Sequence, residues 1–180
     1  EITYLGDVGG PIKQKVTVPN TPGEVLPLFA QSNNLVAPSA NPFRITNLEN
    51  YLEVEPNNAL AEAKEKQTTP SAAPVALNGI IDKPGDEDWI KFTAKKDEKF
   101  DLIVHARGIR SPLDPVLEVF NKDAGGLGGN DDNGANPDSK IAGWACPADG
   151  EYFIRVRDHL SRGGPDYVYR VEIAPAEQVL

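Results

Sequence analysis

Three consecutive acidic residues, 86–88, lie between a Pro-Gly turn signal and an aromatic residue, Trp89. Carboxylates held this close together repel one another unless water, hydrogen-bond donors or a cation compensate their charge. The residues that follow alternate between apolar and polar with the period of a half-buried strand, so that Ile90, Phe92 and Ala94 share one face. The acids are therefore expected at the start of a strand, in a turn that a cation could occupy.

A second oxygen-rich segment, EVEPNN, lies upstream and offers the carboxylates of Glu53 and Glu55 and the amides of Asn57 and Asn58. Ca²⁺ takes about six to eight oxygen ligands, drawn from carboxylates, amides and backbone carbonyls. The two segments could supply such a set if the first folds back onto the second. The alternative interpretation is structural: Glu55 and the Asn pair would cap a following helix, and the acids of the turn would be solvated or would fix the turn.

A third acidic cluster, the sequence NDDN at 130–133, lies in the glycine-rich loop 125–134. It fits an EF-hand poorly, because placing Gly134 at the sharp turn puts Gly129 at the first ligand position and Lys140 at the last. It also resembles one calcium β-roll repeat, but such sites need stacked copies and the chain has one. A solvated surface loop is the favoured interpretation.

Catalytic chemistry finds little support in the sequence. The two histidines are His105 and His159, and no HExxH, GxSxG or CxxC motif occurs. Ser161, His159 and Asp158 are neighbours in sequence, whereas the members of a catalytic triad converge from separate segments. Cys146 is the single cysteine and is expected to be a small core residue. The prediction is that the chain is not an enzyme.

Composition narrows the choice of partners. The net charge is −9, from 18 basic and 27 acidic residues, which argues against nucleic acid or an anionic membrane as a partner and is compatible with a cation. No apolar run reaches the length of about 18 residues that a membrane-spanning helix needs, so no membrane insertion is expected. A single cysteine allows no intrachain disulfide and leaves the cellular compartment open.

The periodicity of the chain predicts an all-β protein with two parts. Residues 1–48 carry short β-like runs at 12–18 and 25–30 between prolines. They are expected to be the C-terminal part of a preceding β-sandwich (Ig-like) domain, or strands that lean on the next domain. Residues 49–180 contain one helical stretch near 59–66 and then many short alternating strands, which predicts an antiparallel, jelly-roll-like β-sandwich. Helices do not alternate with the strands, which excludes a parallel α/β sheet.

Several motifs in this second part resemble the bacterial pre-peptidase C-terminal domain. In order between 53 and 174 they are EPNN, NGII, GDEDWIKF, SPLDPVLEVF, DGEYFIRVRD and GGPDYVYRVEI. The resemblance implies a jelly-roll β-sandwich that accompanies secreted bacterial enzymes or large surface proteins without being their catalyst. It is similar in form to the collagen-binding domains of clostridial collagenases, in which carboxylates and Asn near the start of the domain hold calcium.

The resemblance also implies a set of calcium ligands. Carried over position by position, they are Glu53, Glu55, Asn57 and Asn58 in the first segment and Asp86 and Asp88 in the second. The chain departs from the collagenase pattern of two aspartates three apart before the aromatic, because the earlier position falls on Gly85. Either Asp86 takes its place or one ligand is missing.

The expected function follows from these observations. The chain is predicted to be a calcium-stabilised, non-catalytic accessory module of a secreted or cell-surface bacterial protein, serving as spacer, stabiliser or adhesion module beside other domains of its parent. The alternative is a module that targets an absent enzyme domain to a polysaccharide or an extracellular protein. That alternative requires an exposed aromatic strip, for which the candidates are Tyr152, Phe153, Tyr167 and Tyr169.

Overall fold

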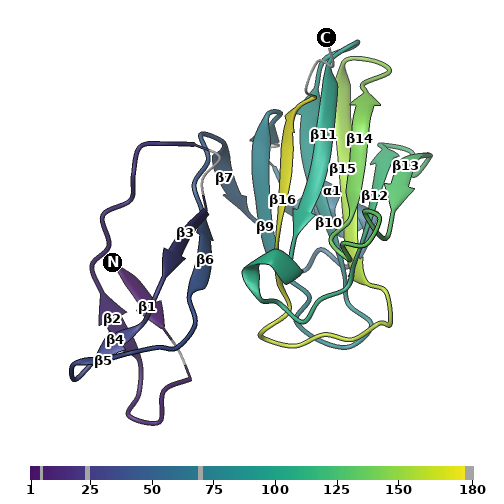
Figure 1. The fold of residues 1–180 in the computed structure, drawn as a ribbon. Coiled ribbons are helices and arrows are strands. Elements are labelled where there is room, and N and C mark those ends of the chain that lie inside the picture. Colours follow the sequence, from purple (N-terminus) through teal and green to yellow (C-terminus); the bar gives the residue numbers. More distant parts are fainter. Residues whose placement is uncertain (5, 23–24, 69–70, 177–180) are drawn as a thin grey trace. The chain divides into compact units, whose positions relative to one another are not determined.

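The computed structural model of the chain describes residues 1–4, 6–22, 25–68 and 71–176. It divides into two compact units, residues 1–47 and residues 48–180 (Figure 1). The end of the predicted second domain, residues 177–180, lies outside the described residues. No helix within the described ranges is both long enough and apolar enough to cross a membrane.

The first unit consists of short strands that pair as three two-stranded sheets, β1–β2, β3–β6 and β4–β5. Its strands are β1 (Ile2–Tyr4), β2 (Ile12–Gln14), β3 (Val25–Leu28), β4 (Gln31–Ser32), β5 (Leu35–Val36) and β6 (Asn41–Arg44). The predicted strand over 12–18 is thus wrong in its second half. Among the described residues, 15–18 have no strand partner, and without a neighbouring strand the alternation of Val16 and Val18 does not produce a strand.

The second unit is a β-sandwich, as predicted, made of two five-stranded sheets with the orders β13-β12-β15-β10-β8 and β14-β11-β16-β9-β7 (Figure 1). The strands are β7 (Glu49–Leu52), β8 (Ser71–Ala72), β9 (Val75–Ile80), β10 (Glu87–Ala94), β11 (Lys99–His105), β12 (Pro115–Asn121), β13 (Gly126–Asn130), β14 (Lys140–Ala145), β15 (Gly150–Asp158) and β16 (Val168–Pro175).

Successive strands of this unit mostly alternate between the two sheets, which is the jelly-roll-like connectivity that the sequence predicts. All pairs are antiparallel except β7 with β9 and β8 with β10. Both parallel pairs lie at an edge of a sheet, where β7 and β8 arrive from the segment before β9. The segment between β7 and β8 therefore passes from an edge of one sheet to an edge of the other.

The core lies between the sheets and comes from the alternating positions identified in the sequence. Phe100, Leu102 and Val104 of β11 face Ile90 and Phe92 of β10 across it, and all five are buried. Such side chains stabilise the fold by about 1.5–3 kcal/mol each through burial. The inner-face alternation of β9, β15 and β16 is continuous with this cluster, so one core holds both sheets together.

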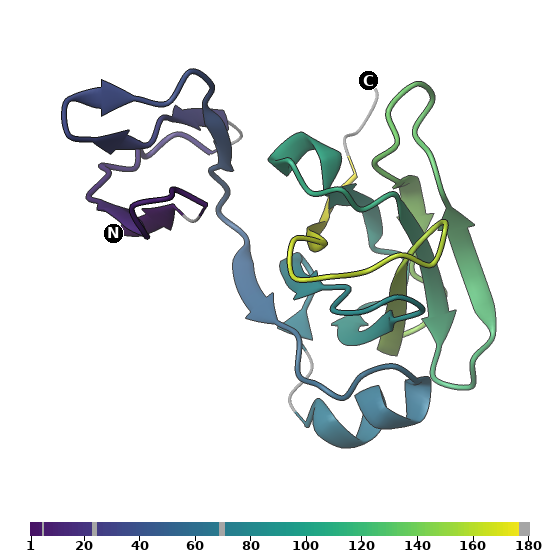
Figure 2. The ribbon, with the colours of Figure 1, turned by 90° about the horizontal axis from the view of Figure 1, so that it is seen from below.

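A short helix, α1 (Leu60–Lys66), covers part of the outer face of the first sheet (Figure 2). Ala63 of the helix packs against Trp89 and Phe153, which are buried although they alternate with inward-facing neighbours. The helix was predicted at this place. Its expected cap at Asn58 is wrong: the N-cap residue is Ala59, in an extended conformation with no side-chain cap bond.

Gln67 follows the helix and completes the sheet edge beside β10. Its amide nitrogen donates to the carbonyl of Trp89 at 2.9 Å, and its amide oxygen accepts from the Lys91 N–H. A side chain thereby satisfies two backbone groups that a neighbouring strand would otherwise pair.

Candidate metal centre

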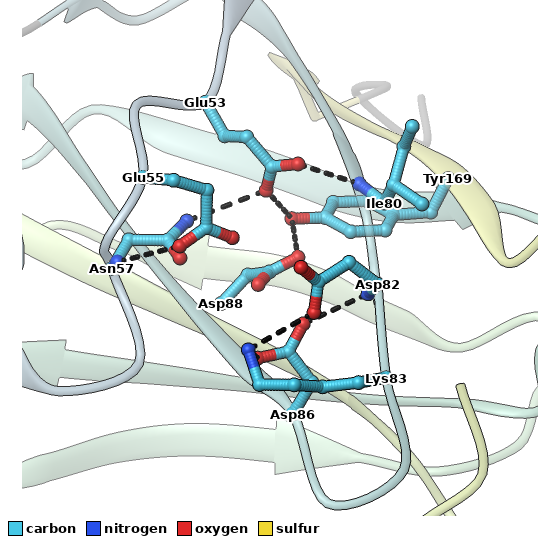
Figure 3. Close-up of polar contacts among 9 residues, drawn as sticks. All are labelled: Glu53, Glu55, Asn57, Ile80, Asp82, Lys83, Asp86, Asp88 and Tyr169. Carbon is cyan, nitrogen blue, oxygen red and sulfur yellow. Dashed lines mark hydrogen bonds and ion pairs between the residues drawn. The ribbon is translucent and has the colours of Figure 1, made fainter. Parts of the chain in front are cut away.

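Glu53 is positioned by the edge strand β7 and its neighbour β9. The Glu53 N–H continues the parallel pairing by donating to the Asn78 carbonyl at 3.0 Å. Its side chain turns back over β9, where Oε1 accepts the Ile80 N–H at 2.7 Å. Both ends of Glu53 are therefore held by the backbone of β9, and its second carboxylate oxygen is directed toward Tyr169 (Figure 3).

Asp88 lies near the start of β10 on the inward-facing side, with Ile90 and Phe92, and is fully buried. Its Oδ2 accepts a 2.8 Å hydrogen bond from the Tyr169 hydroxyl. That hydroxyl is also 3.3 Å from Oε2 of Glu53, so one phenol lies between two carboxylates from different segments. Tyr169 belongs to β16, which lies in the other sheet from β10 and in the same sheet as β7. Its hydroxyl therefore holds Asp88 of one sheet close to Glu53, which follows the edge strand of the other.

Asp82 and Asp86 belong to the turn between β9 and β10. The Asp82 N–H donates to Oδ2 of Asp86 at 2.8 Å, and the Asp86 N–H donates to the Lys83 carbonyl at 3.2 Å. Gly85 has a φ of +82°, in the region that favours glycine. The turn thus favours glycine at position 85, and it brings the carboxylates of Asp82 and Asp86 close together.

The two oxygen-rich segments meet at Asn57. The Trp89 N–H donates to the Asn57 carbonyl at 2.9 Å, which joins the first segment to the start of β10. The Asn57 side chain lies beside Glu55, and its amide nitrogen donates to both Glu55 carboxylate oxygens at 3.0 and 3.1 Å. The Asn57 N–H also donates to Oε2 of Glu55 at 3.0 Å, so Asn57 holds this carboxylate in place.

The result is a pair of carboxylate triads that share one member. One carboxylate oxygen each from Glu53, Glu55 and Asp88 lie within 4.8 Å of one another, and the same holds for Glu55, Asp82 and Asp86 (Figure 3). Burial increases inward: Glu55 and Asp82 are exposed, Glu53 is half-buried, and Asp86 and Asp88 are buried. The triads therefore form one acidic cluster that is exposed to solvent at Glu55 and Asp82.

Burial and mutual repulsion of these carboxylates make their ionised forms unfavourable, and this raises the pKa values of four of the five acids. Burial, followed by the nearby charge of Glu53, raises the pKa of Asp88 from 3.8 to about 10. Burial also raises the pKa values of Glu53, Glu55 and Asp86. A group of acids that cannot all ionise together is stabilised either by protons or by a cation, and a divalent cation would allow all of them to ionise at neutral pH.

Two features bear on whether a cation fits. Oδ1 of Asp86 is buried and has no hydrogen-bond donor among the described residues, so this oxygen has lone pairs to offer. Within the described residues its one ion pair is with the exposed Lys83 ammonium, which lies 3.5 Å from that oxygen and 3.1 Å from Oδ1 of Asp82. The triad of Glu53, Glu55 and Asp88 has no recorded basic neighbour within the described ranges. The oxygen donors of both triads are of the type that Ca²⁺ prefers.

Of the six residues that the sequence singled out, five come together. Asn58 lies next to Asn57 but forms no hydrogen bond to the acids in the described part of the chain. Sequence reasoning missed Asp82, which lies four residues before Asp86 and reaches it because the turn is tight. It also missed Tyr169, whose place on an alternating strand indicated only a core or surface aromatic.

Glycines allow the close approach that this site requires. A Cβ at Gly79 would lie 2.3 Å from the Tyr169 hydroxyl and 2.4 Å from Oε2 of Glu53. A Cβ at Gly163 would lie 2.1 Å from the carbonyl oxygen of Lys83. Both glycines thus let neighbouring groups pack against the backbone, one under the first triad and one behind the turn that carries the second.

Part of the chain is similar in sequence to part of a known protease. A stretch of 107 residues is 36% identical to part of a probable subtilase-type serine protease of Deinococcus radiodurans. The stretch covers 57% of this chain and 14% of that protein, so the similarity concerns a small part of a large polypeptide. No family model matches the chain.

Proposed function

We propose that this chain is a non-catalytic accessory module of an exported bacterial protease, and that calcium bound at the two carboxylate triads stabilises its β-sandwich. The observation that carries the proposal is the convergence of exposed Glu55, half-buried Glu53 and fully buried Asp88, with no basic side chain paired to them within the described residues. A buried cluster of acids without a counter-charge destabilises a fold, whereas the same cluster around Ca²⁺ stabilises it.

The chemistry of the donors favours calcium over other metals. The five acids of the cluster and the Asn57 amide offer hard oxygen ligands, and the two triads contain neither histidine nor cysteine among the described residues, whereas Zn²⁺ prefers nitrogen and sulfur. Five carboxylates from two segments also exceed the one or two that Mg²⁺ uses when it retains its waters. Glu55, shared by both triads, would bridge two ions.

A metal at this position would brace elements that are far apart in the chain. Its ligands belong to the segment after β7, to the turn before β10 and to the start of β10, where Asp88 bonds Tyr169 of β16. One ion would thus connect both sheets at one end of the sandwich. The proposed role is mechanical: a rigid module that separates or stabilises other domains of its parent.

Several observations support an accessory role in an exported protein. The similarity to the Deinococcus protein involves 14% of its length, which is the size of a module rather than of a complete protease. The motif order between 53 and 174 resembles the pre-peptidase C-terminal domain, which accompanies secreted enzymes. Extracellular fluids contain enough calcium to fill sites of millimolar affinity.

Residues 1–47 fit the end of a larger β-sandwich domain. Among the described residues of this unit, Leu28 and Ile45 are the only buried apolar side chains. Seven other apolar side chains of the described part of this unit are exposed: Val8, Val18, Val25, Phe29, Leu35, Val36 and Phe43. A unit of this size with so small a core needs further strands to stabilise it.

The alternative of a carbohydrate-binding face has less support. In the described part of the second unit, every Trp, Phe and Tyr side chain is buried or half-buried. Tyr152, Phe153 and Tyr169, which were candidates for an aromatic strip, are at most 4% exposed. No flat row of exposed aromatics is therefore available in these residues to stack on sugar rings.

Thermal unfolding of the metal-stripped chain, with and without millimolar calcium, tests the proposal. A ligand at a hundred times its dissociation constant adds about 2.7 kcal/mol to the free energy of unfolding, which raises the midpoint by several degrees. The calcium-dependent rise should disappear in Glu55→Ala, whose exposed side chain can be removed without opening the core. A wild-type midpoint that does not respond to calcium would refute the proposal.

A further inference from the structure

The sequence contains two Asn-Gly pairs, Asn78-Gly79 and Asn133-Gly134. In such a pair the backbone nitrogen of the glycine can attack the side-chain amide carbon of the asparagine, because glycine has no side chain to hinder the approach. The reaction needs a deprotonated backbone nitrogen and a main chain that is free to rotate. The fold places the two pairs in opposite environments.

Asn133-Gly134 lies in the loop between β13 and β14, and both residues are exposed. The backbone of Asn133 exchanges two hydrogen bonds with Asn136, at 2.8 and 3.1 Å, which closes a tight turn over Gly134 and Ala135. Within the described residues, neither the Asn133 side chain nor the Gly134 N–H has a recorded hydrogen bond. A Cβ at Gly134 would meet nothing within 4 Å, so no neighbouring group crowds this side of the turn.

Asn78-Gly79 lies inside β9, between β16 and β7. The Asn78 amide nitrogen donates to the Tyr51 carbonyl at 3.0 Å, and its amide oxygen accepts from Arg170 at 3.0 Å. Gly79 is covered by Tyr169, in register across from it. Rotation of this backbone into the geometry of attack would separate two strand pairs.

Two neighbouring asparagines, Asn130 at the end of β13 and Asn136 in the loop, differ from Asn133 in their chemistry. Asn136 precedes Pro137, whose nitrogen carries no hydrogen and cannot act as the nucleophile. Asn130 precedes an aspartate, and its side chain is held: the amide nitrogen donates to the Lys140 carbonyl at 2.8 Å and the oxygen accepts from the Asp131 N–H at 2.9 Å. Of these three asparagines, only Asn133 is followed by glycine and has a side-chain amide without a hydrogen bond among the described residues.

We propose that Asn133 is a site of spontaneous deamidation in the folded protein, and that the fold protects Asn78 from the same reaction. Hydroxide removes the Gly134 N–H proton, the nitrogen forms a bond to the Asn133 side-chain carbon, and ammonia leaves to give a cyclic imide. Water then opens the imide at either carbonyl, which yields aspartate or isoaspartate. No oxidant or cofactor takes part.

The product changes the loop in two ways. A new carboxylate joins Asp131 and Asp132, which are exposed neighbours, and increases the negative charge of the loop. The isoaspartate product also inserts a methylene into the backbone, which breaks the register of the two hydrogen bonds between residues 133 and 136. Asp131 lies 3.6 Å from His159, so the added charge would appear beside that pair.

Peptide mapping by mass spectrometry after incubation of the folded protein in mildly alkaline buffer tests the proposal. Residue 133 should deamidate at least about tenfold faster than residue 78, because reaction at Asn78 requires the opening of a paired strand. In denaturant the two rates should converge, and in isotopically labelled water the oxygen label should enter at residue 133. Asn133→Gln should abolish the change, and the matched variant Asn136→Gln should leave it intact.

Two results would overturn the proposal. Equal deamidation of Asn78 and Asn133 in the folded chain would show that β9 gives no protection. An intact Asn133 in the folded chain, together with reaction in denaturant, would show that the turn blocks the attack.

Discussion

The hydroxyl of Tyr169 in β16 donates a 2.8 Å hydrogen bond to Oδ2 of Asp88 in β10, and so links the two sheets at the acidic end of the sandwich. Both side chains are buried, and Asp88 is the most strongly perturbed acid of the site. The bond serves two purposes. It supplies a donor to a carboxyl group removed from water, and it holds Asp88 where one of its oxygens lies within 4.8 Å of oxygens of Glu53 and Glu55.

Tyr169→Phe removes this donor and leaves the shape of the core unchanged. We expect the free energy of unfolding in the presence of a chelator to fall by about 1–3 kcal/mol, because a buried polar group loses its partner. Chemical denaturation measures the change. Tyr167→Phe is the matched control, since Tyr167 is half-buried and has no recorded bond to the acids. Equal stability of Tyr169→Phe and wild type would contradict the role assigned to the hydroxyl.

Gly79→Ala tests the close packing under the first triad. Its Cβ would lie 2.4 Å from Oε2 of Glu53, so the carboxylate and Tyr169 must move. We expect calcium affinity to fall by about 10–100-fold, as for other residues that orient metal ligands. Gly128→Ala in β13 is the control, because its Cβ would have no neighbour closer than 3.8 Å. Wild-type affinity in Gly79→Ala would rule out Glu53 as a ligand in the observed geometry.

The fold could be predicted from the sequence to a large extent, because alternation of apolar residues depends on local spacing. Phe100, Leu102 and Val104 are buried as their period of two requires. The same rule fails at Phe153, which is buried on the opposite face because α1 covers it. Which outer-face residues a helix covers depends on tertiary packing and is not encoded in the strand itself.

The candidate site was only partly predictable for a similar reason. The two acidic segments were visible because their residues are clustered in sequence. Asp82 and Tyr169 were not, since they reach the site only through the turn geometry at Gly85 and the pairing of β16 with β9. The two segments converge because β7 pairs in parallel with β9, and this pairing cannot be predicted from the sequence of so short an edge strand.

Asp158 provides a pH-dependent prediction away from the metal centre. Burial alone would raise its pKa, but hydrogen bonds from the Arg162 side chain and from the N–H groups of Asp114, Arg162 and Leu160 outweigh burial and lower the pKa from 3.8 to about 2. Because the folded-state pKa lies below the unfolded value, the stabilisation is complete above about pH 4 and is lost as the pH falls to about 2.

The corresponding variant is Asp158→Asn. At neutral pH its free energy of unfolding should be about 2 kcal/mol lower than that of wild type. This difference should shrink as the pH falls from about 4 to 2. Urea denaturation across this range measures it. A difference that stays constant with pH would show that the ionised carboxylate is not the source of the stabilisation.

Lys83→Gln tests whether an ammonium group competes with calcium at the second triad. The Lys83 side chain is exposed, and Nζ lies 3.1 Å from Oδ1 of Asp82. Its removal should tighten calcium binding by up to about fivefold, in keeping with the modest strength of exposed ion pairs. Lys99→Gln is the control: it makes the same change in net charge at an exposed position of β11, and it should leave calcium affinity unchanged. Weaker binding in Lys83→Gln would contradict competition.

Calorimetric titration of calcium into the metal-stripped chain tests the central claim most directly, with Glu55→Gln and Glu87→Gln as a matched pair. Both variants remove one acid, but Glu55 belongs to both triads, whereas Glu87 pairs with Arg155 at 3.0 Å. We predict that wild type and Glu87→Gln bind calcium and that Glu55→Gln loses binding at both triads. Absence of binding in wild type, or wild-type binding in Glu55→Gln, would contradict the assignment of this acidic cluster as a calcium site.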